Sequence, residues 1–320
     1  MMCLPACTAS QPREEAPVQE EQTDTLPATL SLIFVGDLMQ HQSQIDAAMR
    51  KEGFDYSASF RHVAQEIQKS DIAIGNLECA MGGKPYAGYP CFSAPDEFLY
   101  AIRDAGFDVL STANNHCLDR GSKGGLRTIH LLDSLSIPHL GTYPDSACQA
   151  ATHPLIIEKN GIKLALIAYT YATNGIKATP PFRVNYIDEK QIAQDIARAK
   201  SQQPDAIIAL MHWGEEYHSL PSKAQKTLAD KLFSQGVTHI IGSHPHVVQP
   251  IELRTDSAAA TRRLLVYSLG NFISGMSANK TDGGLMVRMT LEKHRQKTTL
   301  KHADYSLVWT LRPAHNALKD

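Results

Sequence analysis

The sequence lacks a long hydrophobic run, a strong net charge and a paired-cysteine motif. No stretch reaches the about 18–20 apolar residues that a membrane-spanning helix requires. The 31 basic and 33 acidic residues give a net charge of −2, whereas a general nucleic-acid binder needs a basic surface. The six cysteines form no C-x-x-C pair, which argues against a zinc ribbon, although a Cys79–Cys91 disulfide stays open. Gly82-Gly83 lacks the Lys-Ser/Thr ending of a phosphate-binding loop and predicts a turn.

The first 30 residues differ in composition from the rest of the chain. They hold one basic residue, Arg13, and five acidic residues, together with four prolines and no apolar periodicity. A segment of this kind cannot bury enough apolar surface to fold. We therefore predict that residues 1–29 are a disordered acidic tether and that residues 30–320 form a single domain. That length can bury a core without disulfides or structural zinc.

The segment Leu4-Pro5-Ala6-Cys7 resembles the end of a bacterial lipoprotein signal. The six residues before Cys7 cannot supply the charged start and the apolar core of about 7–15 residues that such a signal has. One interpretation is a truncated signal, with a lipid anchor at Cys7 and a place in the cell envelope, on the periplasmic or outer surface. The alternative is an accidental match in a cytoplasmic protein.

From residue 30 onward, short apolar runs alternate with amphipathic stretches. This alternation predicts an α/β architecture. After about residue 247 the pattern predicts strand after strand. The expected helices are 58–69, 96–105, 123–135, 188–200 and 222–234. The expected strands are 31–35, 71–75, 107–111, 137–140, 162–169, 205–211, 237–241, 264–269 and 285–291.

Polar side chains follow five of these predicted strands. They are Asp37, Asn76 with Glu78, Asn115 with His116, His212, and His244 with His246. Because ligand sites in α/β sheets lie beyond the carboxyl ends of strands, we expect these clusters to meet at one rim. Carboxylates, amides and imidazoles together suit zinc, manganese or iron. Two such ions about 3.5–4 Å apart can hold a phosphate and activate a water.

The order of these clusters resembles the calcineurin-like metallophosphoesterases and, more closely, the CapA family of bacterial capsule or poly-gamma-glutamate biosynthesis. The resemblance covers roughly residues 31–275. It rests on the segments Val35-Gly36-Asp37-Leu38-Met39, Gly75-Asn76-Leu77-Glu78, Ser93-Ala94-Pro95, 105–119, 212–217, Gly242-Ser243-His244-Pro245-His246 and 267–272.

The resemblance implies a metallophosphoesterase-like sandwich of two mixed β-sheets flanked by helices, with one or two divalent ions (Mn, Zn or Fe). It implies that His116 is the acid that protonates the leaving group and that phosphoesters are hydrolysed by metal-bound hydroxide. The implied metal ligands are Asp37 and His246 for the first ion, Glu78 as the bridge, and Asn115, His212 and His244 for the second ion.

Two positions depart from the phosphoesterase pattern. Met39 stands where those enzymes have the His of Asp-x-His, and Asn76 stands where they have the Asp of Gly-Asp. Both changes affect the first ion and the bridge, so we predict one tight metal and a weaker second one. His41 is a candidate replacement ligand. Trp213, Glu215 and Asn271 are candidate substrate-binding residues, although solvent exposure would explain the first two equally well.

Three functions remain open from the sequence. The first is a metal-dependent hydrolase of the CapA type that acts on a phosphorylated or polymeric envelope substrate. The second is a non-catalytic polymer-handling subunit with a degenerate metal site, working beside capsule-assembly proteins; Met39 and Asn76 favour it. The third is a metal-dependent amide hydrolase acting on a gamma-linked polymer. Nucleic acid is not an expected partner.

Overall fold

The computed structural model describes residues 26–256 and 261–311. The predicted tether up to residue 25 and the anchor position Cys7 lie outside the described residues. The first strand begins at Ala28, two residues before the predicted start of the domain. Among the described residues, no helix has the length and apolar character needed to span a membrane.

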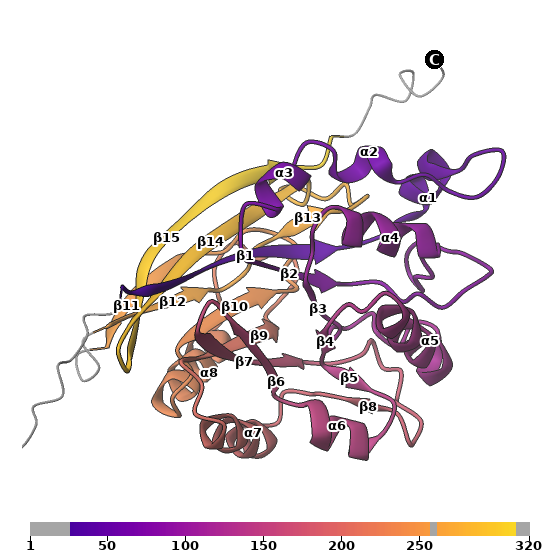
Figure 1. Ribbon diagram of the computed structural model, residues 1–320. Helices are drawn as coiled ribbons and strands as arrows, with labels where there is room; N and C mark the ends of the chain where they lie inside the picture. The colour runs from indigo at the N-terminus through magenta and orange to yellow at the C-terminus, as the bar shows by residue number, and fades with distance from the viewer. Residues whose placement is uncertain (1–25, 257–260, 312–320) are drawn as a thin grey trace, which may run out of the picture.

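Two mixed β-sheets form the centre of the fold (Figure 1). The larger sheet has seven strands and the smaller has six. In the larger sheet the order is β15 (Lys297–Trp309), β14 (Gly283–His294), β1 (Ala28–Leu38), β2 (Ile72–Leu77), β3 (Val109–Ser111) and β4 (His139–Leu140), with β13 (Asn271–Ile273) beside β1. In the smaller sheet it is β11 (Ile251–Asp256), β12 (Thr261–Val266), β10 (His239–Ser243), β9 (Ala206–His212), β7 (Ile162–Thr170) and β6 (Leu155–Lys159).

The two sheets pack face to face on side chains that alternate along their strands. On β1, Leu30, Leu32 and Phe34 face the other sheet, where they meet residues such as Leu164 and Leu166 of β7. The intervening residues of β1, Ile33 and Val35, face the helices instead. This alternation is the period of two that a strand buried on both faces requires.

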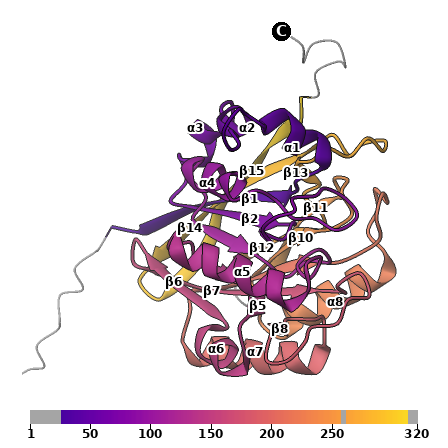
Figure 2. The ribbon, with the colours of Figure 1, turned by 90° about the vertical axis from the view of Figure 1, so that its right-hand side faces the viewer.

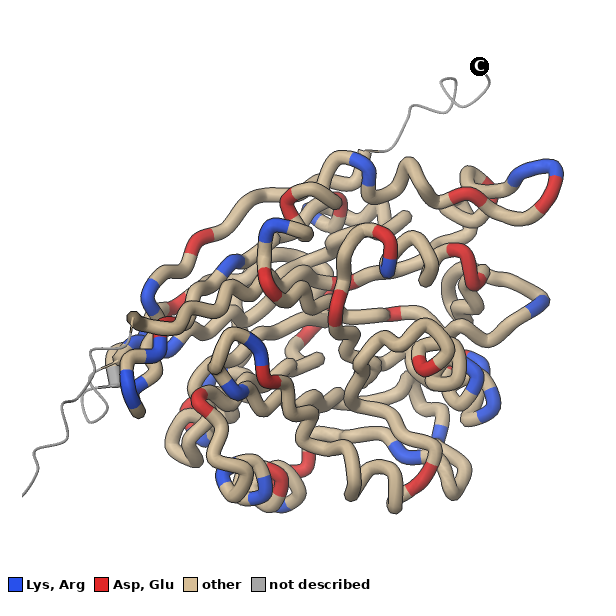
Figure 3. The backbone as a smooth tube through the Cα atoms, in the orientation of Figure 1, with Lys and Arg blue, Asp and Glu red and all other residues tan. Residues whose placement is uncertain are grey.

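Helices cover the outer face of each sheet, which gives a four-layered sandwich (Figures 1 and 2). The larger sheet is covered by α1 (Gln42–Ala48), α2 (Ser57–Phe60), α3 (Ala64–Ile67) and α4 (Asp96–Asp104). The smaller sheet is covered by α7 (Glu189–Ser201) and α8 (Lys223–Ser234). Beside both lies a two-stranded sheet of β5 (Thr142–Tyr143) and β8 (Arg183–Val184), flanked by α5 (Gly121–Ser134) and α6 (Ser146–Thr152). Basic and acidic residues are interspersed over these layers (Figure 3).

This architecture confirms the predicted sandwich of two mixed sheets flanked by helices. The strands β11 to β15 also confirm the strand-rich end of the domain. The predicted helix 58–69 is wrong in one respect, because the structure divides it into α2 and α3. Between them the Val63 amide donates to the Phe60 carbonyl three residues back, which tightens the chain into a turn. The Cys79–Cys91 disulfide is not formed: Cys79 is a buried thiol and Cys91 an exposed one.

Candidate metal centre

The five predicted clusters meet where strands of both sheets end. Asp37, Asn76 and Glu78 come from β1 and β2 of the larger sheet, and His212 and the two histidines after β10 come from the smaller sheet. Pairing of β1 places Asp37 opposite Asn76 on one side and opposite Asn271 on the other. The residues brought together at the rim, all buried, are Asp37, Asn76, Glu78, Asn115, His116, His212, His244 and His246.

Two glycines let the strands reach this arrangement. A Cβ atom on Gly36 would lie 1.8 Å from the Gly270 carbonyl oxygen, and one on Gly242 would lie 2.0 Å from the Tyr267 carbonyl oxygen. Real Cβ atoms do not approach other heavy atoms so closely. Asp37 therefore follows a glycine because β1 must pass directly against the turn before β13.

The loop after β10 holds its histidines in a strained backbone conformation. His244 has a φ of 99° and His246 a φ of 58°, on either side of Pro245. Positive φ is uncommon for residues other than glycine, and it costs of order 1–3 kcal/mol. The fold imposes this cost at the two positions where it presents imidazoles to the rim.

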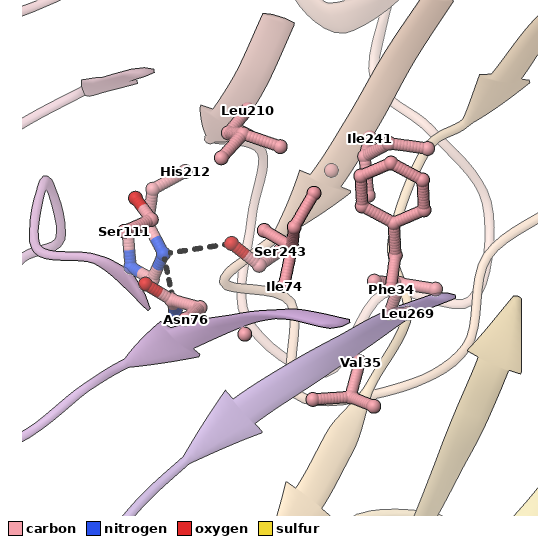
Figure 4. Close-up of a pocket in the computed structure, with 12 residues that line it drawn as sticks. Phe34, Val35, Ile74, Asn76, Ser111, Leu210, His212, Ile241, Ser243 and Leu269 are labelled. Carbon is pink, nitrogen blue, oxygen red and sulfur yellow. Dashed lines mark hydrogen bonds between the residues drawn. The ribbon is translucent and has the colours of Figure 1, made fainter. Parts of the chain in front are cut away.

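Asn76 lies between the two carboxylates of the site. Its side-chain amide donates to Asp37 Oδ1 at 2.8 Å and to Glu78 Oε2 at 3.2 Å. The same nitrogen lies 3.3 Å from His212 Nδ1, as Figure 4 shows. Asn114 donates to Asn76 Oδ1 at 3.2 Å and so fixes the amide in this orientation. Asn76 therefore occupies the centre of the site as a hydrogen-bond donor.

Burial raises the pKa of both carboxyl groups, but their neighbours act on them in opposite directions. Burial, and then the charge of Asp37, raises the pKa of Glu78 well above its ordinary value. Burial also opposes ionisation of Asp37, but the hydrogen bond and charge of His246 outweigh it and lower the pKa of Asp37. Two carboxylates this close resist ionising together unless a cation joins them.

Burial holds two of the three histidines, His212 and His244, as neutral imidazoles. Burial lowers the pKa of His212 well below its ordinary value and that of His244 to about 3. Burial opposes protonation of His246 as well, but its contact with Asp37 raises the pKa. His246 Nδ1 lies 3.1 Å from Asp37 Oδ2 and 3.0 Å from Asn271 Oδ1. Neutral imidazole is the form that binds metals.

Two polar atoms at the rim have no hydrogen-bond partner among the described residues. They are Glu78 Oε1 and His244 Nδ1, both buried. Glu78 Oε1 lies 3.7 Å from His212 Nε2 and 3.8 Å from His246 Nε2. These separations are too long for hydrogen bonds, but ligands of one tetrahedral zinc ion, each about 2.0–2.2 Å from it, lie about 3.3–3.6 Å apart. The donor set therefore fits a divalent cation.

Two groups of side chains have ligand atoms within 4.8 Å of one another, Asp37–Glu78–His212 and Glu78–His244–His246. Glu78 belongs to both, as expected for a bridging carboxylate. The grouping of His212 and His246 is the reverse of what the family resemblance implies. Asn115 Oδ1 lies 2.9 Å from His212 Nε2, so its carbonyl oxygen also faces the site.

His116 stands beside these groups and is held by Asp119. Its Nδ1 lies 2.8 Å from Asp119 Oδ2, and Phe92 packs against the ring with centroids 4.6 Å apart. Asp119 also accepts the Phe92 backbone amide at 2.7 Å. The sequence analysis did not assign Asp119, although its place three residues after His116 puts the two on one side of a helical turn.

The structure buries two of the three candidate substrate-binding residues and leaves Glu215 exposed. Trp213 is buried, donates to the Tyr267 carbonyl at 2.9 Å and belongs to the core under α7 and α8. Asn271 is also buried and holds His246, so it supports the site from behind. Glu215 is exposed and lies 3.7 Å from His218. The charge of its neighbour Glu216 raises the pKa values of Glu78 and His246.

His41 and Met39 lie outside both groups of ligand atoms. The Gly275 amide donates to His41 Nδ1 at 3.1 Å, and the ring packs against Phe92 with centroids 5.1 Å apart. This contact occupies one ring nitrogen and argues against the replacement role. Met39 is buried in the apolar layer between the larger sheet and its helices.

Beneath His212 the two sheets enclose a small cavity of about 20 Å³ (Figure 4). Phe34, Ile241 and Leu269 form part of its apolar wall. On the polar side, Ser243 Oγ lies 3.1 Å from His212 Nδ1. The space is about that of one water molecule, so the floor of the site is closed toward the core.

Comparison with known proteins identifies the family of this chain. The family model described as "Bacterial capsule synthesis protein PGA_cap" matches residues 31–276. The chain belongs to this family. It is 29% identical over 288 residues to "Capsule biosynthesis protein CapA" of Bacillus anthracis, covering 86% of this chain and 66% of that protein. It is 27% identical over 280 residues to "PGA biosynthesis protein CapA" of Bacillus subtilis strain 168, covering 83% and 68%. This member of the PGA_cap family therefore spans about two thirds of the length of these relatives.

Among solved structures, the NAD nucleotidase NadN of Haemophilus influenzae superposes with a TM-score of 0.53 at 13% identity, over 88% of this chain and 51% of that one. At this identity the likeness shows the fold alone. It agrees with the metallophosphoesterase-like sandwich, which the sequence analysis expected from the resemblance to the CapA family.

Proposed function

We propose that this PGA_cap protein is a metal-dependent hydrolase that cleaves a phosphoester in the production of capsule or poly-gamma-glutamate. The observation that carries the proposal is the unpartnered Glu78 Oε1, which lies 3.7–3.8 Å from the Nε2 atoms of two buried histidines. A buried carboxylate oxygen without a partner costs free energy. Glu78 and His244 would lose this cost by holding a divalent ion.

The ligands would be Asp37, Glu78, His212, His244 and His246, with Asn115 completing the set through Oδ1. Manganese, zinc or iron suits this mixture of oxygen and nitrogen donors. When bound, such an ion neutralises phosphate charge and activates a water. Asn271 and Asn76 hold His246 and the carboxylates in place by hydrogen bonds.

His116 would act on the leaving group. Asp119 accepts from Nδ1, which fixes the ring, so the proton for the leaving group would come from Nε2 of the doubly protonated imidazolium. A positioned acid of this kind contributes about 10²–10⁴ to a hydrolytic rate. His116→Gln should therefore bind metal as the parent does while its turnover falls by about 100-fold or more.

Asn76 favours a second candidate function, a polymer-handling subunit without catalysis. Its amide donates hydrogen bonds to both carboxylates, so it partly satisfies them without any ion. Where a bridging carboxylate would attract two cations, this amide attracts none. The same feature supports one tight metal and a weaker second one in the hydrolase.

We place the protein in the cell envelope, with capsule-assembly proteins as partners. Membership of a family described as bacterial capsule synthesis proteins supports this location. Lipid attachment at Cys7 is tested by palmitate labelling of the protein in cells. Label that persists in Cys7→Ser would contradict the anchor.

The decisive experiment measures metal and turnover on the same preparation. Protein purified without chelators is analysed for metal, titrated with Mn²⁺, and assayed on bis(p-nitrophenyl) phosphate, p-nitrophenyl phosphate and gamma-glutamyl-p-nitroanilide. Bound metal with phosphoester cleavage that His116→Gln loses supports the proposal. Cleavage of the anilide alone would move the function to amide hydrolysis. No binding at micromolar metal would contradict the hydrolase and favour the polymer-handling subunit.

A further inference from the structure

We infer that Asn174, on the loop that follows β7, is a positioning residue that turns the carbonyl oxygen of Asn115 toward the metal. The inference rests on the proposed metal site and adds a residue that the strand-end pattern did not indicate. It predicts that metal affinity depends on a side chain that is not a ligand.

An asparagine ligand has an orientation problem. Its side chain ends in one oxygen that can bind a cation and one NH₂ group that cannot, and the two are nearly equal in shape. In this structure Asn115 Oδ1 faces His212 Nε2 at 2.9 Å. For this orientation to persist, the NH₂ group needs a hydrogen-bond acceptor on the other side of the amide.

Asn174 supplies that hold. Asn115 Nδ2 donates to Asn174 Oδ1 at 3.3 Å. Asn174 Nδ2 lies 3.4 Å from His116 Nδ1, but that nitrogen already donates to Asp119, so the hydrogen bond of Asn174 is the one to Asn115. Asn174 has a φ of 48°, a left-handed conformation that asparagine tolerates better than most residues.

Tyr171 lies on the same loop, at the mouth of the site. Its ring lies 4.4 Å from that of His244 and stacks on His212 at 6.3 Å with an interplanar angle of 17°. The Tyr171 backbone amide donates to the His212 carbonyl at 3.0 Å, which fixes the start of the loop on β9. The ring is 44% exposed, so it forms an outer wall of the site.

The test is a Mn²⁺ titration of single variants by calorimetry. Partners that orient metal ligands typically change affinity about 10–100-fold when removed. Asn174→Ala should weaken Mn²⁺ binding within that range. Asn174→Asp keeps an acceptor oxygen at the same left-handed position and should restore at least the parent affinity.

Asn160→Ala is the matched control. Asn160 also has a left-handed backbone, with a φ of 52°, but its side chain bonds to the Thr29 carbonyl and to Asp71, away from the rim. Its substitution should leave the Mn²⁺ affinity unchanged. The melting temperature of the metal-free protein should fall no further in Asn174→Ala than in Asn160→Ala.

A double-mutant cycle separates positioning from a structural effect. With Asn115→Ala already present there is no amide to orient, so adding Asn174→Ala should not weaken Mn²⁺ binding further. Equal losses in both backgrounds would overturn the inference, as would parent affinity in Asn174→Ala. If the parent protein binds no Mn²⁺ at micromolar concentration, the proposed function fails and the inference fails with it.

Discussion

The smaller sheet carries a second buried polar cluster on the face that packs against α7. There, His153 Nε2 lies 3.3 Å from both Asp195 Oδ2 and the Tyr169 hydroxyl. Tyr169 donates to Asp195 at 2.9 Å, and the Tyr143 hydroxyl lies 2.9 Å from His153 Nδ1. This cluster uses the residue types of the rim, including a histidine beside a carboxylate, yet none of its members is among the described atoms that lack a partner.

The two clusters differ in their ratio of donors to acceptors. The cluster around His153, called the inner cluster below, has a single carboxylate, Asp195. Tyr169, His153 and Gln191 all contact it. The rim has two carboxylates that share the amide of Asn76, and it leaves Glu78 Oε1 without a donor. A buried polar cluster is therefore not by itself a site. The unmatched acceptor indicates that a cation belongs there.

Breaking the inner cluster should have the largest effect on stability. Asp195→Ala leaves Tyr169 and His153 buried without their shared acceptor, so unfolding in urea should show a loss of about 3–5 kcal/mol. Its Mn²⁺ affinity should match that of the parent. Asp230→Ala, which removes a largely exposed partner of Arg254, is the control and should cost about 0–1 kcal/mol. If Asp195→Ala lost as little free energy of unfolding as the control, the hydrogen bonds to Asp195 would not stabilise the fold.

Removing a ligand from the rim should have the opposite effect: stability without metal stays almost unchanged, and metal affinity falls. His244→Ala removes a candidate ligand whose Nδ1 has no protein partner, so the metal-free protein should unfold almost as the parent does. Mn²⁺ affinity should fall at least 100-fold, because losing a ligand costs more than losing an orienting partner. The two readouts are chemical denaturation without metal and calorimetric titration. Unchanged affinity would remove His244 from the site.

The buried histidine of β10, His239, allows a test of stability against pH. Burial lowers the pKa of His239 to about 3, and its Nδ1 accepts the Leu264 amide at 3.0 Å. The unfolded chain takes up a proton below pH 6.5 that the folded protein refuses, so stability falls as pH drops from 6.5 toward 3. At pH 5 the loss is about 2 kcal/mol.

The measurement is urea unfolding at pH 7 and pH 5 for the parent and for His239→Asn. The variant's side-chain oxygen can accept from Leu264 without titrating. The parent should lose about 2 kcal/mol more than the variant over this interval. Equal losses would mean that His239 is not held neutral by the fold.

The sequence predicted the parts of the site that depend on strand order. Parallel strands of one sheet end at one edge, so Asp37 and Glu78 had to converge once their strands were identified. His212 belongs to the other sheet and reaches them because the two sheets pack face to face. Trp213 was misplaced because it directly follows a strand-end histidine, and only packing decides whether such a side chain turns to the rim or to the core. Asn174 was missed because its role depends on a left-handed backbone in a loop without periodicity.

The candidate ligands come from both sheets, and this has a mechanical consequence. An ion held by Glu78 on one side and His212, His244 and His246 on the other would tie the two layers together at the carboxyl ends of their strands. At 100 times its dissociation constant, such an ion adds about 2.7 kcal/mol to the stability of the folded state. At the opposite end of the sandwich, where Leu30, Leu32 and Leu164 pack together, the ion would add no local stability. Slowing of amide hydrogen exchange on metal addition should therefore be concentrated at the rim ends of β1, β2, β9 and β10 and fade along each strand.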